Sequence, residues 1–143
     1  MKNLWNAKAA AALTRRPDAI VIGADTVVVL ANQRILGKPR DEGEAREMLL
    51  GLSGRTHEVL TGVAVHRAGQ SWSEVECTVV EFAPIGGGDL DWYLASGEWR
   101  DKAGAYGVQG YAGRFIPRID GSYSNVVGLP VERVFRMLRQ AGL

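Results

Sequence analysis

The chain has a single cysteine, Cys77, among its 143 residues. One cysteine excludes an intramolecular disulfide and argues against a metal site built on thiolates. Cys77 lies in a stretch of alternating apolar residues, which favours a small core residue over a nucleophile. The net charge is only +1, so the charge balance indicates neither a nucleic acid nor a membrane as a partner. No apolar run approaches the length of a transmembrane helix and no signal peptide is visible, which makes the cytoplasm the expected location.

Three common catalytic signatures are also absent from the sequence. It contains no Walker phosphate loop, no paired-cysteine metal motif and no nucleophile elbow. Glycine, by contrast, is abundant at 18 residues, and many of these lie in the second half of the chain. Glycines at such density are typical of tight turns and of places where the backbone approaches a ligand.

Helical and strand patterns alternate along the chain. The patterns predict helices at residues 3–14, 41–52, 89–96 and 130–141, and strands at residues 19–30, 34–36, 58–66, 72–82 and 114–119. The third and fourth of these strands are separated by a short polar segment and read as an antiparallel hairpin. This alternation indicates one α/β or α+β domain, residues 1–143, with helices flanking a mixed sheet.

Asp25 is the most informative residue of the chain. It lies in the apolar run 19–30, which is rich in β-branched residues and predicts a buried strand. A carboxylate there is costly unless something pairs with it, and Gly23, two residues earlier, opens space on the same face of the strand. A catalytic or metal-binding Asp in a cleft is one interpretation. A buried Asp satisfied by backbone N–H groups or a nearby Arg is the other.

Two further polar clusters suit a phosphate-bearing ligand. Lys38 lies in a Gly-Lys-Pro turn, and Lys102 and Gln109 lie in the glycine-rich segment 101–110. Lysines act as point charges on phosphate oxygens, and the donor and acceptor of a glutamine suit the edge of a nucleobase. Each element is weak alone, because Lys38 and Lys102 are also typical surface lysines and Gln109 is typical of a loop.

Five ordered motifs together resemble the Maf family, nucleoside triphosphate pyrophosphatases first named for septum formation. The similarity extends over nearly the whole chain, and the combination is far more specific than any one motif. The matching stretches are Ile22-Gly-Ala-Asp-Thr-Val-Val-Val29, Ile35-Leu-Gly-Lys-Pro39, Leu52-Ser-Gly-Arg-Thr-His-Glu-Val59, Asp101-Lys-Ala-Gly-Ala-Tyr-Gly-Val-Gln-Gly110 and Tyr123-Ser-Asn-Val-Val-Gly-Leu-Pro130.

The resemblance implies a fold and a reaction. The fold would be an α/β domain with a mixed, bent sheet and a central cleft, similar to that of inosine triphosphate pyrophosphatase. The reaction would cut a nucleoside triphosphate between its α and β phosphates, with a divalent cation, Mg²⁺ or Mn²⁺. The loop ending in Gln109 resembles the branch of the family that acts on dTTP and UTP rather than on 7-methyl-GTP.

The resemblance also implies roles for particular residues. Asp25 would accept the proton of the attacking water and also touch the metal. Thr26 and Gln109 would lie at the base-recognition positions. Lys8, Lys38 and Lys102 would contact phosphates or organise the site, although a lysine in an alanine-rich helix, such as Lys8, is also typical of a side chain that snorkels to solvent.

The chain departs from the family at its N-terminus. The family's first strand, first helix and Ser-x-x-Arg phosphate loop have no counterpart in residues 1–143. Without them we expect a free strand edge, loss of phosphate-binding arginines, weak activity and low stability. Two alternatives therefore stay open: an inactive nucleotide-binding remnant, and an interaction protein that acts in division. A homodimer formed through the free edge is compatible with each.

Overall fold

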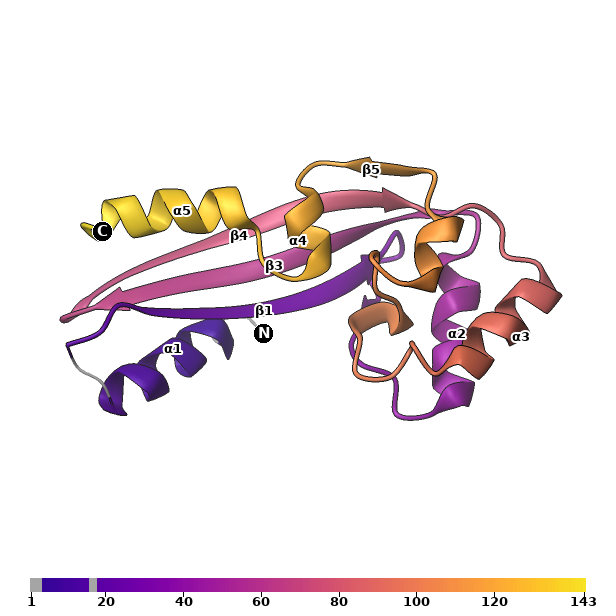
Figure 1. Ribbon diagram of the computed structural model, residues 1–143, viewed down its shortest axis with the longest axis horizontal. Helices are drawn as coiled ribbons and strands as arrows, with labels where there is room; N and C mark the ends of the chain where they lie inside the picture. The colour runs from indigo at the N-terminus through magenta and orange to yellow at the C-terminus, as the bar shows by residue number, and fades with distance from the viewer. Residues whose placement is uncertain (1–3, 16–17) are drawn as a thin grey trace.

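The computed structural model describes residues 4–15 and 18–143. Its strands form one sheet of order β2-β1-β3-β4-β5, with helices on both faces (Figure 1). The strands are β1 (Val21–Leu30), β2 (Ile35–Leu36), β3 (Thr56–Arg67), β4 (Gln70–Glu81) and β5 (Arg118–Asp120). The helices are α1 (Leu4–Arg15), α2 (Glu42–Leu52), α3 (Gly87–Ser96), α4 (Tyr123–Val127) and α5 (Val131–Gln140), and two 3₁₀ segments are η1 (Ala103–Ala105) and η2 (Tyr111–Phe115).

The predicted α/β layering is confirmed, with two corrections. The four pairings between the described strands are all antiparallel, where the sequence predicted a mixed sheet. The tight β1–β2 and β3–β4 turns reverse the chain, so no helix has to carry it across to a parallel neighbour. The strand predicted at residues 114–119 is also shifted. The first part of that segment closes η2, and pairing with β4 begins only at Arg118.

The β3–β4 hairpin is the longest pairing of the sheet. It joins twelve residues of each strand, from Thr56 opposite Glu81 to Arg67 opposite Gln70. The two turn residues, Ala68 and Gly69, have φ angles of 45° and 83°. Positive φ at both central positions matches the right-handed twist of the strands on either side. The hairpin therefore forms the long axis of the molecule (Figure 1).

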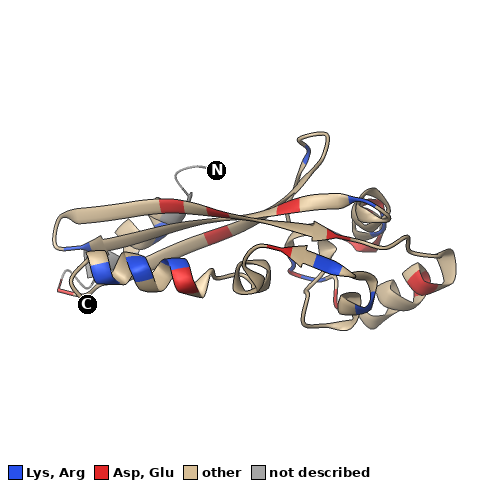
Figure 2. Ribbon diagram, turned by 90° about the horizontal axis from the view of Figure 1, so that it is seen from above, with Lys and Arg blue, Asp and Glu red and all other residues tan. Residues whose placement is uncertain are grey.

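At the end of the sheet near that turn, helices cover both faces. Ala64 of β3 packs with Ala9 of α1, whereas its strand neighbours Val63 and Val65 pack with Met137 of α5. Successive side chains of a strand point to opposite faces, so α1 and α5 lie on opposite sides of the sheet. Arg133 of α5 adds ion pairs to β4, and Figure 2 shows basic positions along α5 beside acidic ones on the strands.

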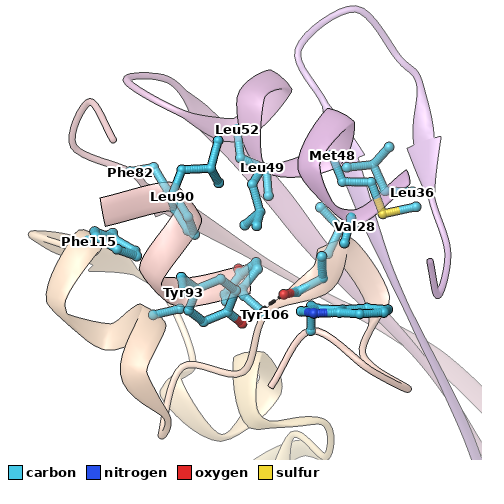
Figure 3. Packing of buried hydrophobic residues seen from close by; sticks show 14 of the residues in the cluster. Val28, Leu36, Met48, Leu49, Leu52, Phe82, Leu90, Tyr93, Tyr106 and Phe115 are labelled. Carbon is cyan, nitrogen blue, oxygen red and sulfur yellow. Dashed lines mark hydrogen bonds between the residues drawn. The ribbon is translucent and has the colours of Figure 1, made fainter. Parts of the chain in front are cut away.

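The larger core lies at the other end of the sheet, under α2 and α3. Leu49 of α2, Leu90 and Tyr93 of α3 and Phe82 are each at most 3% exposed and belong with Val28 of β1 to one buried cluster (Figure 3). Burial of these side chains removes them from water, and each contributes on the order of 1.5–3 kcal/mol. This core fixes the ends of β1 and β3 against the loops that follow α3.

The cysteine prediction was wrong. Cys77 is exposed, and its Sγ donates to Oε2 of Glu58 on the neighbouring strand at 2.9 Å. Its strand neighbours two positions away, Val75 and Val79, are 50% and 38% exposed. The alternating pattern of β4 therefore identified a strand but not which face of it is covered. Among the described residues, no helix is both long and apolar enough to cross a membrane.

Candidate active site

A cavity of about 270 Å³ lies along β1 where the sheet meets the loops of the larger core. Within the described residues β1 pairs with β3 over its whole length but with β2 only at Val28 and Val29, so the edge of residues 21–27 has no strand beside it. The lining comes from β1, β3, the two polar loops and α4. It comprises Ala24, Asp25, Thr26, Val28, Lys38, Val59, Asp101, Lys102, Ala103, Tyr106, Gly107, Val126, Val127 and Gly128.

Asp25 lines this cavity from the face of the sheet that α1 covers. Its Oδ1 accepts a hydrogen bond from Nζ of Lys8 at 3.2 Å. The carboxylate side chain is 23% exposed and the lysine side chain 51% exposed. Asp25 therefore has a partner in an ion pair open to solvent, and one oxygen, Oδ2, has no bond recorded within the described part of the chain.

Thr26 points to the opposite face, as the next residue of a strand must. Its hydroxyl lies 2.8 Å from that of Thr61 on β3 and 3.4 Å from the carbonyl oxygen of Gly128. Thr26 and Thr61 are register partners in the sheet. The cavity thus wraps around the free edge of β1, with a carboxylate on one side of the strand and a hydroxyl on the other.

One hydrogen bond joins the two loops that carry the lysines. The N–H of Gly104 donates to the carbonyl oxygen of Gly37 at 3.1 Å, which places Lys38 and Lys102 on the same cavity. Gly107 leaves room for the side chain of Lys102, because a Cβ at position 107 would lie 2.8 Å from Cε of Lys102. The two lysines therefore line one cavity because a backbone hydrogen bond holds their loops together.

The segment following Asp101 is conformationally strained. Asp101, Gly104 and Ala105 have φ angles of 59°, 72° and 70°, a region that side chains other than glycine rarely adopt. Ala105 is fully buried and its carbonyl oxygen accepts from the Tyr93 hydroxyl at 2.8 Å. Strained backbone of this kind is concentrated at ligand sites.

Tyr106 lines the cavity beside Val28 and Val59. Its hydroxyl lies 2.7 Å from Nε2 of His57, and both side chains pack edge-on against Phe82. Burial lowers the pKa of His57 to about 4 and raises the pKa of Tyr106 above its usual value. Both groups are therefore neutral near pH 7, and Tyr106, held from behind by His57, gives the cavity an uncharged wall.

Another part of the lining comes from the short helix α4 and the glycine after it. Asn125 is fully buried, and its Nδ2 donates to the carbonyl oxygen of Val59 and to the hydroxyl of Thr78, each at 3.0 Å. These bonds tie α4 to β3 and β4. They fix Gly128, which follows α4 and supplies the carbonyl beside Thr26.

Four of the site residues that the sequence predicted lie on one cavity: Asp25, Thr26, Lys38 and Lys102. Lys8 lies outside the lining among the described residues but pairs with Asp25. Gln109 is exposed and also lies outside the lining. Two residues further on, the N–H of Tyr111 donates a hydrogen bond to Glu98. The predicted part of Gln109 in base recognition stays a prediction.

The structure adds residues that the sequence did not single out. Asp101 lines the cavity, and its place directly before Lys102 was the available signal. The described residues contain no group of three or more His, Cys, Asp or Glu side chains placed to hold a metal ion. Among the residues that the structure describes, Asp25 and Asp101 are the carboxylates that line the cavity. Two carboxylates match the way in which Mg²⁺ is held by one or two carboxylates together with substrate phosphates.

The fold and the cavity define an α/β protein whose site combines carboxylates, lysines and glycine-rich loops suited to a phosphorylated ligand. The chain belongs to the family described as Maf-like protein, whose sequence profile matches residues 1–141. The family membership predicted from the five motifs is thereby confirmed.

Relatives in distant organisms share about half of the residues. A dTTP/UTP pyrophosphatase of Symbiobacterium thermophilum is 53% identical over 135 residues, which cover 94% of this chain and 69% of the relative. Proteins of the same name match from an Anaeromyxobacter species, at 52% identity over 86% of this chain and 62% of the relative, and from Pyrococcus horikoshii, at 46% over 92% and 70%. The chain thus spans about two thirds of the length of these relatives.

Proposed function

We propose that the protein is a nucleoside triphosphate pyrophosphatase that hydrolyses dTTP and UTP to the monophosphate and pyrophosphate. The observation that carries the proposal is the single cavity on which Asp25, Asp101, Lys38 and Lys102 meet. The name shared by its relatives, dTTP/UTP pyrophosphatase, supports the same activity and the same substrates.

The proposed chemistry needs few groups. Water attacks the α-phosphorus, a new P–O bond forms, the bond from that phosphorus to the α–β bridging oxygen breaks, and pyrophosphate leaves. Asp25 accepts the proton of the water, a role that requires a carboxylate within hydrogen-bond reach of the nucleophile. Lys38 and Lys102 neutralise charge on the phosphates. Catalysis of phosphoryl transfer consists mainly of such electrostatic stabilisation together with positioning of the reacting groups.

A divalent cation, Mg²⁺ or Mn²⁺, completes the proposal. Asp25 and Asp101 are the residues that would hold it, together with phosphate oxygens of the substrate. When bound it would supply charge neutralisation at the phosphates. Lys8 has a separate part: it pairs with Asp25 in the free protein and orients the carboxylate until substrate and cation enter.

Product analysis tests the activity. The protein is incubated with dTTP, UTP and 7-methyl-GTP in the presence of Mg²⁺ or Mn²⁺, and the phosphorus products are identified by ³¹P NMR. We expect dTMP and UMP with pyrophosphate, and slower turnover of 7-methyl-GTP. Formation of a nucleoside diphosphate and inorganic phosphate would contradict cleavage between the α and β phosphates. Nucleotide binding without any turnover would favour the non-catalytic alternative.

A further inference from the structure

The hydroxyl of Thr26 has a hydrogen-bond polarity that follows from its two neighbours. A threonine hydroxyl has one proton to donate and two lone pairs. The carbonyl oxygen of Gly128, 3.4 Å away, can only accept, so the proton of Thr26 points there. The hydroxyl of Thr61, 2.8 Å away, must then be the donor of the pair.

The reverse arrangement is worse on two counts. If Thr26 donated to Thr61, the proton of Thr61 would need another acceptor, and none is recorded within the described part of the chain. Thr61 is fully buried, so water cannot supply one, and an unmatched buried hydroxyl costs free energy. The carbonyl of Gly128 would also face a lone pair. The long distance to Gly128 makes the bond from Thr61 the stronger constraint of the two.

We propose that Thr61 is a positioning residue that makes Thr26 a hydrogen-bond acceptor toward the cavity. One lone pair of Thr26 is used by Thr61, and its proton is used by Gly128. The remaining lone pair of Thr26 is left for a ligand, because Thr26 lines the cavity. A ligand group that meets Thr26 is therefore bound best when it presents an N–H.

This inference rests on the proposed function and specifies the base that the site accepts. Uracil and thymine carry a hydrogen on N3, whereas N3 of cytosine is an unprotonated acceptor. To bind cytosine N3, Thr26 would have to turn its proton away from Gly128. The site then discriminates between two pyrimidines of nearly equal size by the direction of one hydrogen bond, which is a stronger basis for selection than shape.

The surrounding structure holds this geometry in place. Thr26 and Thr61 are paired in register within a long antiparallel ladder. Gly128 is fixed because α4 is tied to the sheet by the buried Asn125. Neither neighbour can move without disturbing β3 or α4, so the polarity is built into the fold.

The test replaces the donor and keeps its shape. Thr61→Val removes the hydroxyl at nearly constant volume, and Thr61→Ser restores it. Thr56→Val is a matched control, since it makes the same change on the same strand at an exposed position outside this cavity. For each protein we would measure kcat and KM for UTP and CTP, and the equilibrium binding of UMP and CMP.

We expect the wild type to prefer uracil over cytosine. In Thr61→Val that preference should fall about five- to tenfold, as expected for one hydrogen bond, and the change should appear in KM rather than in kcat. Thr61→Ser should recover most of the preference, and Thr56→Val should match the wild type.

Three outcomes overturn the inference. The first is a folded Thr61→Val protein, with a wild-type circular dichroism spectrum, that keeps its preference while it still hydrolyses UTP. The proposed function would then stand alone. If the wild type hydrolyses no nucleotide, the proposed function fails, and the binding of UMP and CMP to the wild type then tests the inference about Thr61. The second outcome that overturns it is equal binding of UMP and CMP, or binding of neither. If Thr61→Val does not fold, Thr61→Ala takes its place, and an unchanged preference there is the third.

Discussion

His57 illustrates how much of this site depends on single buried polar residues. It is 2% exposed, its Nε2 meets the Tyr106 hydroxyl at 2.7 Å, and its Nδ1 has no partner within the described residues. A protonated imidazole there would place a charge in the core without a counter-charge. Burial accordingly lowers the pKa of His57 to about 4, well below the value of an unfolded chain.

This pKa shift predicts acid sensitivity. Between pH 6.5 and pH 4 the unfolded state binds a proton at His57 that the folded state does not, so stability falls as pH falls through that window. The loss from this group reaches about 3 kcal/mol and is absent above pH 7. Urea unfolding at pH 7 and pH 4.5 measures it. His57→Phe should remove this part of the pH dependence and His66→Gln should keep it. If the stability of His57→Phe depended on pH as strongly as that of the wild type, His57 would not be the source of the acid sensitivity.

At the same scale, the sequence revealed some residues of the site and concealed others. Asp25 could be predicted because a carboxylate within a run of apolar β-branched residues is costly unless it is paired. His57 and Thr61 could not be predicted in this way. Their partners lie 49 and 35 residues away in the chain, and a single polar residue in an alternating strand carries no sign of its face or its neighbour.

The loop that contains η1 is the element on which the lysine arrangement depends. Gly104 packs directly on β1, because a Cβ at that position would lie 2.9 Å from Cγ2 of Val28. Its N–H also donates to Gly37 of the other lysine loop. The sequence predicted that the glycines of this segment mark tight turns or a close approach of the backbone to a ligand. Gly104 instead lies against Val28, and the approach to a ligand stays a prediction. The sequence could not predict that the partner of Gly104 would be β1.

Gly104→Ala should therefore damage both stability and substrate binding. The alanine must adopt a φ of 72° and its methyl group must displace Val28. This should lower the free energy of unfolding by at least ~1–3 kcal/mol. The displaced loop carries Lys102, so KM for dTTP should rise. Gly87→Ala is the control, because it begins α3 with open space around it and alanine is the better helix former. Guanidinium unfolding and steady-state kinetics check both, and equal effects of the two changes would refute this account of the loop.

At the scale of the whole molecule, one long sheet connects the two larger of the three buried apolar clusters among the described residues. The larger core, around Tyr93 and Leu49, supports the cavity, whereas the smaller core contains Val63, Val65 and Met137 beneath α5. β3 contributes to both, so the cores are joined covalently and by the same ladder. The α/β class was predictable from the alternation of elements, but two cores could not be predicted from local periodicity.

The separation of the cores predicts a separation of effects. Met137 is fully buried in the smaller core, so Met137→Ala should cost about 2–5 kcal/mol of stability. KM for dTTP, measured well below the unfolding temperature, should stay unchanged because the cavity lies in the other part of the sheet. Val131→Ala, at a 58% exposed position of the same helix, should change stability by less than about 0.5 kcal/mol. A marked rise of KM in Met137→Ala would show that the two cores are coupled.

The central claim is that Asp25 carries the hydrolysis of a nucleoside triphosphate in this cavity. The most direct measurement is pyrophosphate release from dTTP by the wild type, by Asp25→Asn and by Asp91→Asn, a change at a 67% exposed side chain on α3. We predict turnover in the wild type and in Asp91→Asn, and loss of at least about two orders of magnitude in Asp25→Asn, as expected when a general base is removed. Asp25→Asn turnover equal to that of the wild type would contradict the account.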